Sequence, residues 1–71
     1  MKVLWNLEKT IAIPVSSILS FEISDTSGWS GAAKVLWNYD RFAIRANFAN
    51  YHEYVFSSTS KNDCINFIES I

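Results

Sequence analysis

The chain has 71 residues, of which 49% are hydrophobic and 18% are charged, so it suits one small folded domain rather than a disordered segment. Six Lys and Arg residues against seven Asp and Glu residues give a formal net charge of −1, which disfavours binding to a polyanion through bulk charge. One Cys excludes an intrachain disulfide framework and a Cys-rich zinc site, and two Gly residues exclude a glycine-rich phosphate loop. We expect a single domain over residues 1–71.

The first four fifths of the chain carry short strand patterns separated by turns. Residues 6–9 and 16–17 are turn signals, and residues 25–28 form the strongest loop signal. Pro14 has no backbone N–H and therefore marks the end of a strand or an edge strand. Alternation in the last strand places Tyr54 and Phe56 on one face. The expected strands are residues 2–5, 10–13, 18–24, 29–37, 42–48 and 52–57.

The C-terminal residues 60–71 predict one helix. Ser60 suits the N-cap position, and Asp63 follows three residues later. Apolar residues then recur with the i, i+3, i+4, i+7 spacing of one helical stripe, at Cys64, Phe67, Ile68 and Ile71. The sequence therefore predicts an α+β fold, in which a curved antiparallel sheet of five or six strands carries this helix on one face.

One such helix is too small to cover the predicted sheet. Its length is about 16 Å at 1.5 Å per residue, whereas five or six strands are spaced about 4.8 Å apart. The sheet must therefore curl into a partial barrel, or a second chain must cover the rest. The face away from the helix would hold apolar and charged residues together, namely Ile18, Ala32, Leu36, Ala43 and Val55 with Glu22, Lys34, Arg45 and Glu53. This face is either a wet face with cross-strand ion pairs, Glu22 with Arg45 and Glu53 with Lys34, or an interface.

A short internal repeat is visible. Residues 2–6, Lys-Val-Leu-Trp-Asn, recur as residues 34–38, and each copy is followed by an acidic and a basic residue. The repeat indicates two similar hairpins that turn after the Asn. It is too short and too few in number for a solenoid, and it indicates no chemistry.

Catalytic, metal and cofactor sites are not expected. Cys64 and His52 are the only nucleophile and base that could act together, but Cys64 belongs to the apolar stripe of the helix and suits a buried side chain. His52 with Glu53 or Asp63 lacks a recognised metal-ligand spacing. We therefore expect a protein that is not an enzyme.

A protein–protein interaction module is favoured by three features: the low charge, the three Trp residues and a predicted sheet that one helix cannot cover. We expect it to form a homodimer, through a strand edge or the uncovered sheet face, and to bind a further protein. The alternative is a single-stranded nucleic-acid binder, in which aromatic residues interleaved with Lys34, Arg41 and Arg45 stack bases. Six cations in all make that alternative the less favoured one. The candidate binding residues are Trp5, Lys34, Trp37, Tyr39, Arg41 and Arg45.

Two resemblances bear on these alternatives. From Trp37 onward, strands followed by one helix resemble in their order the Whirly-type and transcriptional-coactivator single-strand-binding domains, which implies nucleic-acid binding. Nearly the whole chain resembles short proteins of Gram-positive bacteria and their phages, through "LWN" at residues 4–6, "IAIPVSSILSFEI" at 11–23, a Trp-bearing strand, "YVFSSTS" at 54–60 and a closing helix. This second resemblance implies a compact α+β fold and no established activity. In a phage or mobile element, such a protein would suit a small inhibitor that occludes a host protein.

The sequence also predicts a cytoplasmic protein without a membrane segment. Residues 10–21 form a run of twelve uncharged residues, which is too short to span a bilayer. Glu8 precedes this run and Pro14 interrupts it, which disfavours a signal peptide. A lone Cys fits a reducing compartment.

Overall fold

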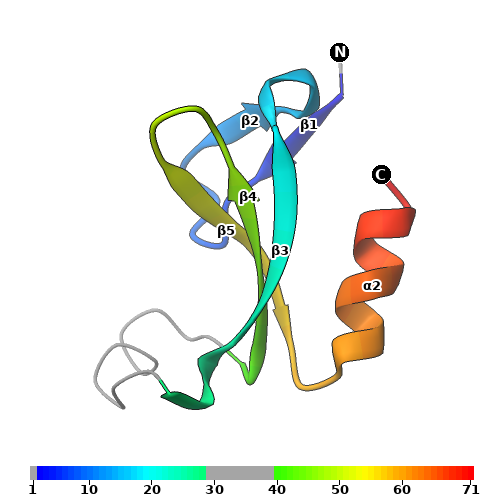
Figure 1. The fold of residues 1–71 in the computed structure, drawn as a ribbon. Coiled ribbons are helices and arrows are strands. Elements are labelled where there is room, and N and C mark those ends of the chain that lie inside the picture. Colours follow the sequence, from blue (N-terminus) through cyan, green and yellow to red (C-terminus); the bar gives the residue numbers. More distant parts are fainter. Residues whose placement is uncertain (1, 29–39) are drawn as a thin grey trace.

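The computed structural model describes residues 2–28 and 40–71. Two short 3-10 helices, at Val15–Ser17 and Thr26–Gly28, lie next to the strands. The strands and the C-terminal helix are, in chain order, β1 (Val3–Trp5), β2 (Ala12–Pro14), β3 (Ser20–Asp25), β4 (Phe42–Asn47), β5 (His52–Ser58) and α2 (Lys61–Glu69) (Figure 1). The predicted α+β class and the C-terminal helix are confirmed.

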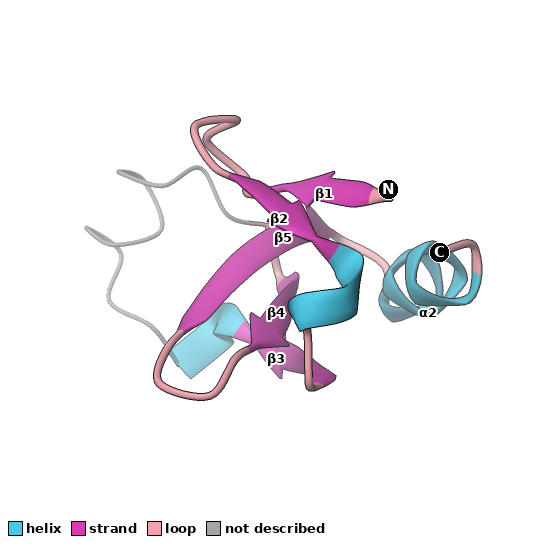
Figure 2. Cartoon of the chain, turned by 90° about the horizontal axis from the view of Figure 1, so that it is seen from above, coloured by secondary structure: helices cyan, strands magenta, loops and turns pink. Residues whose placement is uncertain are grey.

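The expected sheet of five or six strands is wrong, because the described strands form two separate antiparallel sheets. One sheet pairs β1 with β2, and the other has the order β3-β4-β5. Pro14 ends β2, as a residue without a backbone N–H should, and the 3-10 helix Val15–Ser17 then separates β2 from β3. The two-stranded sheet lies beside β5 (Figure 2), and the Leu7 N–H donates a hydrogen bond to the Tyr54 carbonyl at 2.9 Å. The strand predicted at residues 29–37 and the second copy of the repeat, residues 34–38, lie outside the described residues.

A β-bulge between β4 and β5 corrects the predicted faces of β5. Arg45 lies opposite Tyr54, whereas the preceding residue, Ile44, lies opposite Phe56. Val55 is therefore the extra residue, and the bulge turns Tyr54 and Phe56 to opposite faces of the sheet. Val55 is only 4% exposed and belongs to the hydrophobic core.

The core lies between the three-stranded sheet, the two-stranded sheet and α2. Its buried residues are Ile13, Ile44, Ala46, Val55 and Cys64. The predicted stripe of α2 is confirmed, because Cys64 is fully buried and the Phe67 ring stacks on the Phe56 ring with centroids 4.5 Å apart. The predicted solvent-exposed position of Ala43, on the face away from the helix, is wrong, because Ala43 is fully buried.

The start of α2 differs in detail from the predicted cap. Ser60 has extended backbone angles and precedes the first helical residue, as expected, but its side chain makes no capping hydrogen bond. Instead, the Ser58 hydroxyl donates to Asp63 at 2.8 Å and accepts from the Ser60 N–H at 3.2 Å. Ser58 therefore ties the end of β5 to the first turn of the helix. No helix in the described part of the chain is long and apolar enough to cross a membrane.

Candidate binding groove

Of the binding residues that the sequence suggested, the three described ones lie in or next to two different sheets. Trp5 lies on β1 opposite Ala12 and is 47% exposed. Arg41 and Arg45 lie on β4 or at its start, and each faces an acidic residue of β3. The remaining candidates, Lys34, Trp37 and Tyr39, lie outside the described residues.

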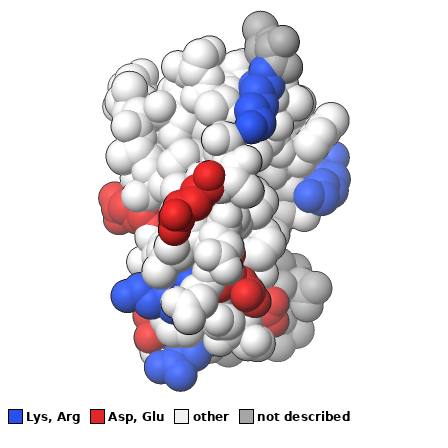
Figure 3. All heavy atoms as spheres, turned by 90° about the vertical axis from the view of Figure 1, so that its right-hand side faces the viewer, with Lys and Arg blue, Asp and Glu red and all other residues white. Residues whose placement is uncertain are grey.

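Both described arginines are compensated by carboxylates. Arg45 forms the predicted cross-strand ion pair with Glu22 at 2.7 Å, and Arg41 lies 3.7 Å from Asp25. The hydrogen bond from Arg45 and its positive charge lower the pKa of Glu22, and the same hydrogen bond raises the pKa of Arg45. On the side of the molecule that carries α2, acidic and basic side chains are interspersed rather than gathered by sign (Figure 3). These two arginines, each beside a carboxylate, therefore do not by themselves form a basic face of the kind that a nucleic-acid binder needs.

A buried amide organises the loop that joins β1 to β2. Asn6 is 1% exposed, and its side-chain oxygen accepts hydrogen bonds from the backbone N–H groups of Thr10 at 2.8 Å and Ile11 at 3.0 Å. Lys9 in the same loop has a φ of 60°, in the left-handed region, so the predicted turn at residues 6–9 is confirmed. At the turn of the hairpin, the Asn6 side chain thus accepts the backbone hydrogen bonds that a paired strand would otherwise accept.

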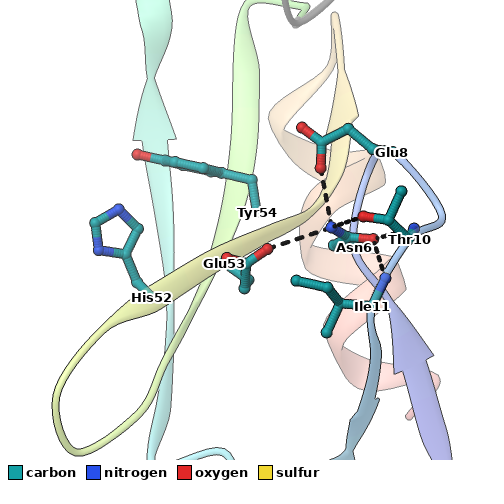
Figure 4. Close-up of a pocket in the computed structure, with 7 residues that line it drawn as sticks. All are labelled: Asn6, Glu8, Thr10, Ile11, His52, Glu53 and Tyr54. Atoms are coloured by element: carbon teal, nitrogen blue, oxygen red, sulfur yellow. Dashed lines mark hydrogen bonds between the residues drawn. The ribbon is translucent and has the colours of Figure 1, made fainter.

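The amide nitrogen of the same residue brings two carboxylates together. Asn6 Nδ2 lies 2.9 Å from Glu8 Oε2, 3.0 Å from Thr10 Oγ1 and 3.3 Å from Glu53 Oε1 (Figure 4). Glu8 comes from the hairpin loop and Glu53 from β5, so the contact also joins the two sheets. Because an amide nitrogen has only two hydrogens, the three acceptors share them.

These side chains surround an open pocket of about 460 Å³. Among the described residues, no Lys or Arg lies within 4.0 Å of the carboxylate of Glu8 or Glu53, so neither carboxylate has an ion-pair partner in that part of the chain. Lys34, which we expected to pair with Glu53, lies outside the described residues. Figure 4 shows Glu53 turned toward Asn6, whereas the side chains of His52 and Tyr54 point to the other side of β5. The lining residues are Asn6, Glu8, Thr10, Ile11, His52, Glu53 and Tyr54.

A second pocket, of about 360 Å³ and mostly apolar, adjoins the first one at Ile11. Tyr51 on its wall is 58% exposed, and its ring stacks on Phe48 with centroids 4.7 Å apart. Ile11 lines both pockets and is 40% exposed. We call the two pockets together the Ile11 groove, which has an acidic half at Glu8 and Glu53 and an apolar half lined by Ile11, Ala12, Ile13, Pro14, Ser17, Phe48, Ala49, Asn50 and Tyr51.

The Cys64 and His52 pair is not brought together in this groove. His52 is exposed and meets the Tyr54 ring edge-on at 5.5 Å, and it lines the acidic half. Cys64 is fully buried under α2 and lines neither half. Burial, and to a lesser degree the charge of Asp63, raise the pKa of the Cys64 thiol. The described residues also contain no group of three or more His, Cys, Asp or Glu that could hold a metal ion.

We expect Cys64 to react with a thiol reagent about 1,000-fold more slowly in the folded protein than in urea. The raised pKa keeps the thiolate scarce and burial blocks access. A stability of about 5 kcal/mol leaves only about one molecule in 5,000 unfolded, so unfolding alone permits a slowing of that order. The measurement is the absorbance change with an aromatic disulfide at pH 8, with and without urea. Similar rates in both conditions would contradict the buried position.

Comparison with known proteins gives no match: no family model, no curated protein and no solved structure resembles the chain significantly. The groove itself is therefore the basis for the proposed function.

Proposed function

We propose that the protein is a non-catalytic protein-binding module and that the Ile11 groove receives a segment of its partner. The observation that carries the proposal is the groove's combination of an apolar half, with Ile11 and Tyr51 exposed, and an acidic half without a compensating cation among the described residues. The pocket volumes lie in the usual range for binding sites, and aromatic side chains such as Tyr51 are enriched in the core of protein interfaces. An inhibitor that occludes a host protein would use a surface of this kind.

The proposal can be tested by selection from a random peptide library with the full chain as the target. The groove variant is Ile11→Ser with Tyr51→Ser, and both side chains are exposed enough for the fold to tolerate the change. Leu19→Ser is the matched control, because Leu19 is 72% exposed and does not line the groove. We expect peptides that are enriched on the wild type and on the control, and lost on the groove variant.

Two further measurements separate the alternatives. Sedimentation velocity at the selection concentration records self-association, so a second copy seated on the exposed Val3 and Trp5 of β1 is told apart from a peptide in the groove. Fluorescence anisotropy of labelled single-stranded DNA and RNA, at low and higher salt, tests the nucleic-acid alternative. Salt-sensitive binding of these oligonucleotides without any groove-dependent peptide would overturn the proposal.

A further inference from the structure

The two carboxylates of the acidic half are held in place before any ligand binds. Glu8 and Glu53 each direct one oxygen to the same amide nitrogen of Asn6, which is itself buried. Their second oxygens, Glu8 Oε1 and Glu53 Oε2, accept no hydrogen bond from the described residues. A carboxylate can accept about four hydrogen bonds, so both retain capacity for a donor that enters the pocket.

The charge of this half selects a cation. Two like charges close together repel each other, and a cation near both is attracted by both. The described residues contain no group of three or more His, Cys, Asp or Glu that could hold a metal ion, whereas an ammonium or guanidinium group needs only a few acceptors. A planar guanidinium, with five N–H donors, suits two carboxylates that come from different segments.

The apolar half selects the neighbour of that cation. Ile11 lines both halves and is exposed, so a ligand that extends from the acidic half into the apolar half can contact this aliphatic side chain. Beyond it, the stacked pair of Phe48 and Tyr51 offers apolar surface that a single small cation would leave uncovered. A peptide segment that carries a basic and an apolar side chain near each other matches both halves.

Resting on the proposed function, we infer that the partner segment places a Lys or Arg side chain between Glu8 and Glu53 and a neighbouring aliphatic or aromatic side chain against Ile11 and Tyr51. The negative charges of Glu8 and Glu53 complement a positively charged side chain, and they therefore favour a basic peptide over a neutral apolar one.

The test is a nuclear magnetic resonance titration of the isotope-labelled full chain with short synthetic peptides. The peptides carry one Arg and one Leu separated by one, two or three Ala residues, and each has two siblings, with citrulline for Arg or Ser for Leu. The protein variant is Glu8→Gln with Glu53→Gln, which keeps an acceptor oxygen for Asn6. The matched control is Asp40→Asn with Glu69→Gln, because both side chains are exposed and neither lines the groove.

We expect one spacing to shift the amide resonances of Ile11, Tyr51 and Glu53. Loss of a charge-assisted hydrogen bond should weaken binding about tenfold or more, both with the citrulline peptide and with the E8Q/E53Q protein, but not with the D40N/E69Q control. Equal binding of the Arg and citrulline peptides, or no effect of E8Q/E53Q, overturns the inference. So does a library selection that yields groove-dependent peptides without a basic residue, and in that case the proposed function stands. If the selection yields no groove-dependent peptide, the proposed function fails as well.

Discussion

Replacing Ile44 with alanine is expected to lower the free energy of unfolding by about 3 kcal/mol. Ile44 is fully buried in the central strand, where it lies opposite Ile23 on β3 and Phe56 on β5. Truncation leaves a cavity against the core cluster that includes Val55 and Cys64. Because a chain of this size buries only about 60% of its unfolded surface, this loss is a large part of its total stability.

The matched control for this prediction is Ile65→Ala. Ile65 lies on α2 and is 37% exposed, so the same truncation removes less buried surface and places a better helix former in the helix. Urea unfolding followed by circular dichroism gives both free energies. Equal losses at the two positions would contradict the assignment of Ile44 to the centre of the core.

The sequence predicted the parts of the fold that depend on neighbouring residues. The apolar stripe of α2 follows from a local spacing, so Cys64 and Phe67 were placed correctly. The ion pair of Glu22 with Arg45 followed from alternation on two strands that turned out to be neighbours. The division into two sheets depends on which strands pair. The residue pattern of a single strand does not identify its partner, so this division could not be predicted.

The β-bulge shows how one residue changes such a prediction. Strict alternation put Tyr54 and Phe56 on one face, but the extra residue Val55 turns Phe56 toward Phe67 of α2. Bulges have a weak sequence signal, and alternation alone cannot reveal a shift of one residue.

The candidate groove was not predicted, although one of its parts had a signal. The turn at residues 6–9 was recognised from its polar residues, but Asn6 was not seen as the residue that holds it. Its contact with Glu53 joins positions 47 residues apart, and sequence spacing carries no information about such a pair. The sequence-based candidates favoured Trp and cations. Of these, Arg41 and Arg45 lie beside carboxylates, and Trp5 is exposed outside the groove.

Changing Asn6 to aspartate is expected to lower the free energy of unfolding by about 2 kcal/mol at pH 7. One oxygen of the new side chain still accepts from the Thr10 and Ile11 N–H groups, so the turn keeps its acceptor. The other replaces the amide nitrogen, the one donor to Glu8 and Glu53 within the described part of the chain, and three carboxylates then meet at one point. Removal of a buried donor and repulsion between like charges act in the same direction.

The dependence of this loss on pH identifies its cause. Clustered carboxyl groups hold protons more tightly in the folded variant than in its unfolded chain, so stability relative to the wild type should rise as the pH falls from 7 toward about 4. Asn66→Asp is the matched control, since Asn66 is exposed on α2 and the same chemical change there adds a solvated charge. Urea unfolding of the three proteins at several pH values measures the difference. A deficit that stays constant with pH would mean that the lost hydrogen bonds, rather than the charges of Glu8 and Glu53, account for it.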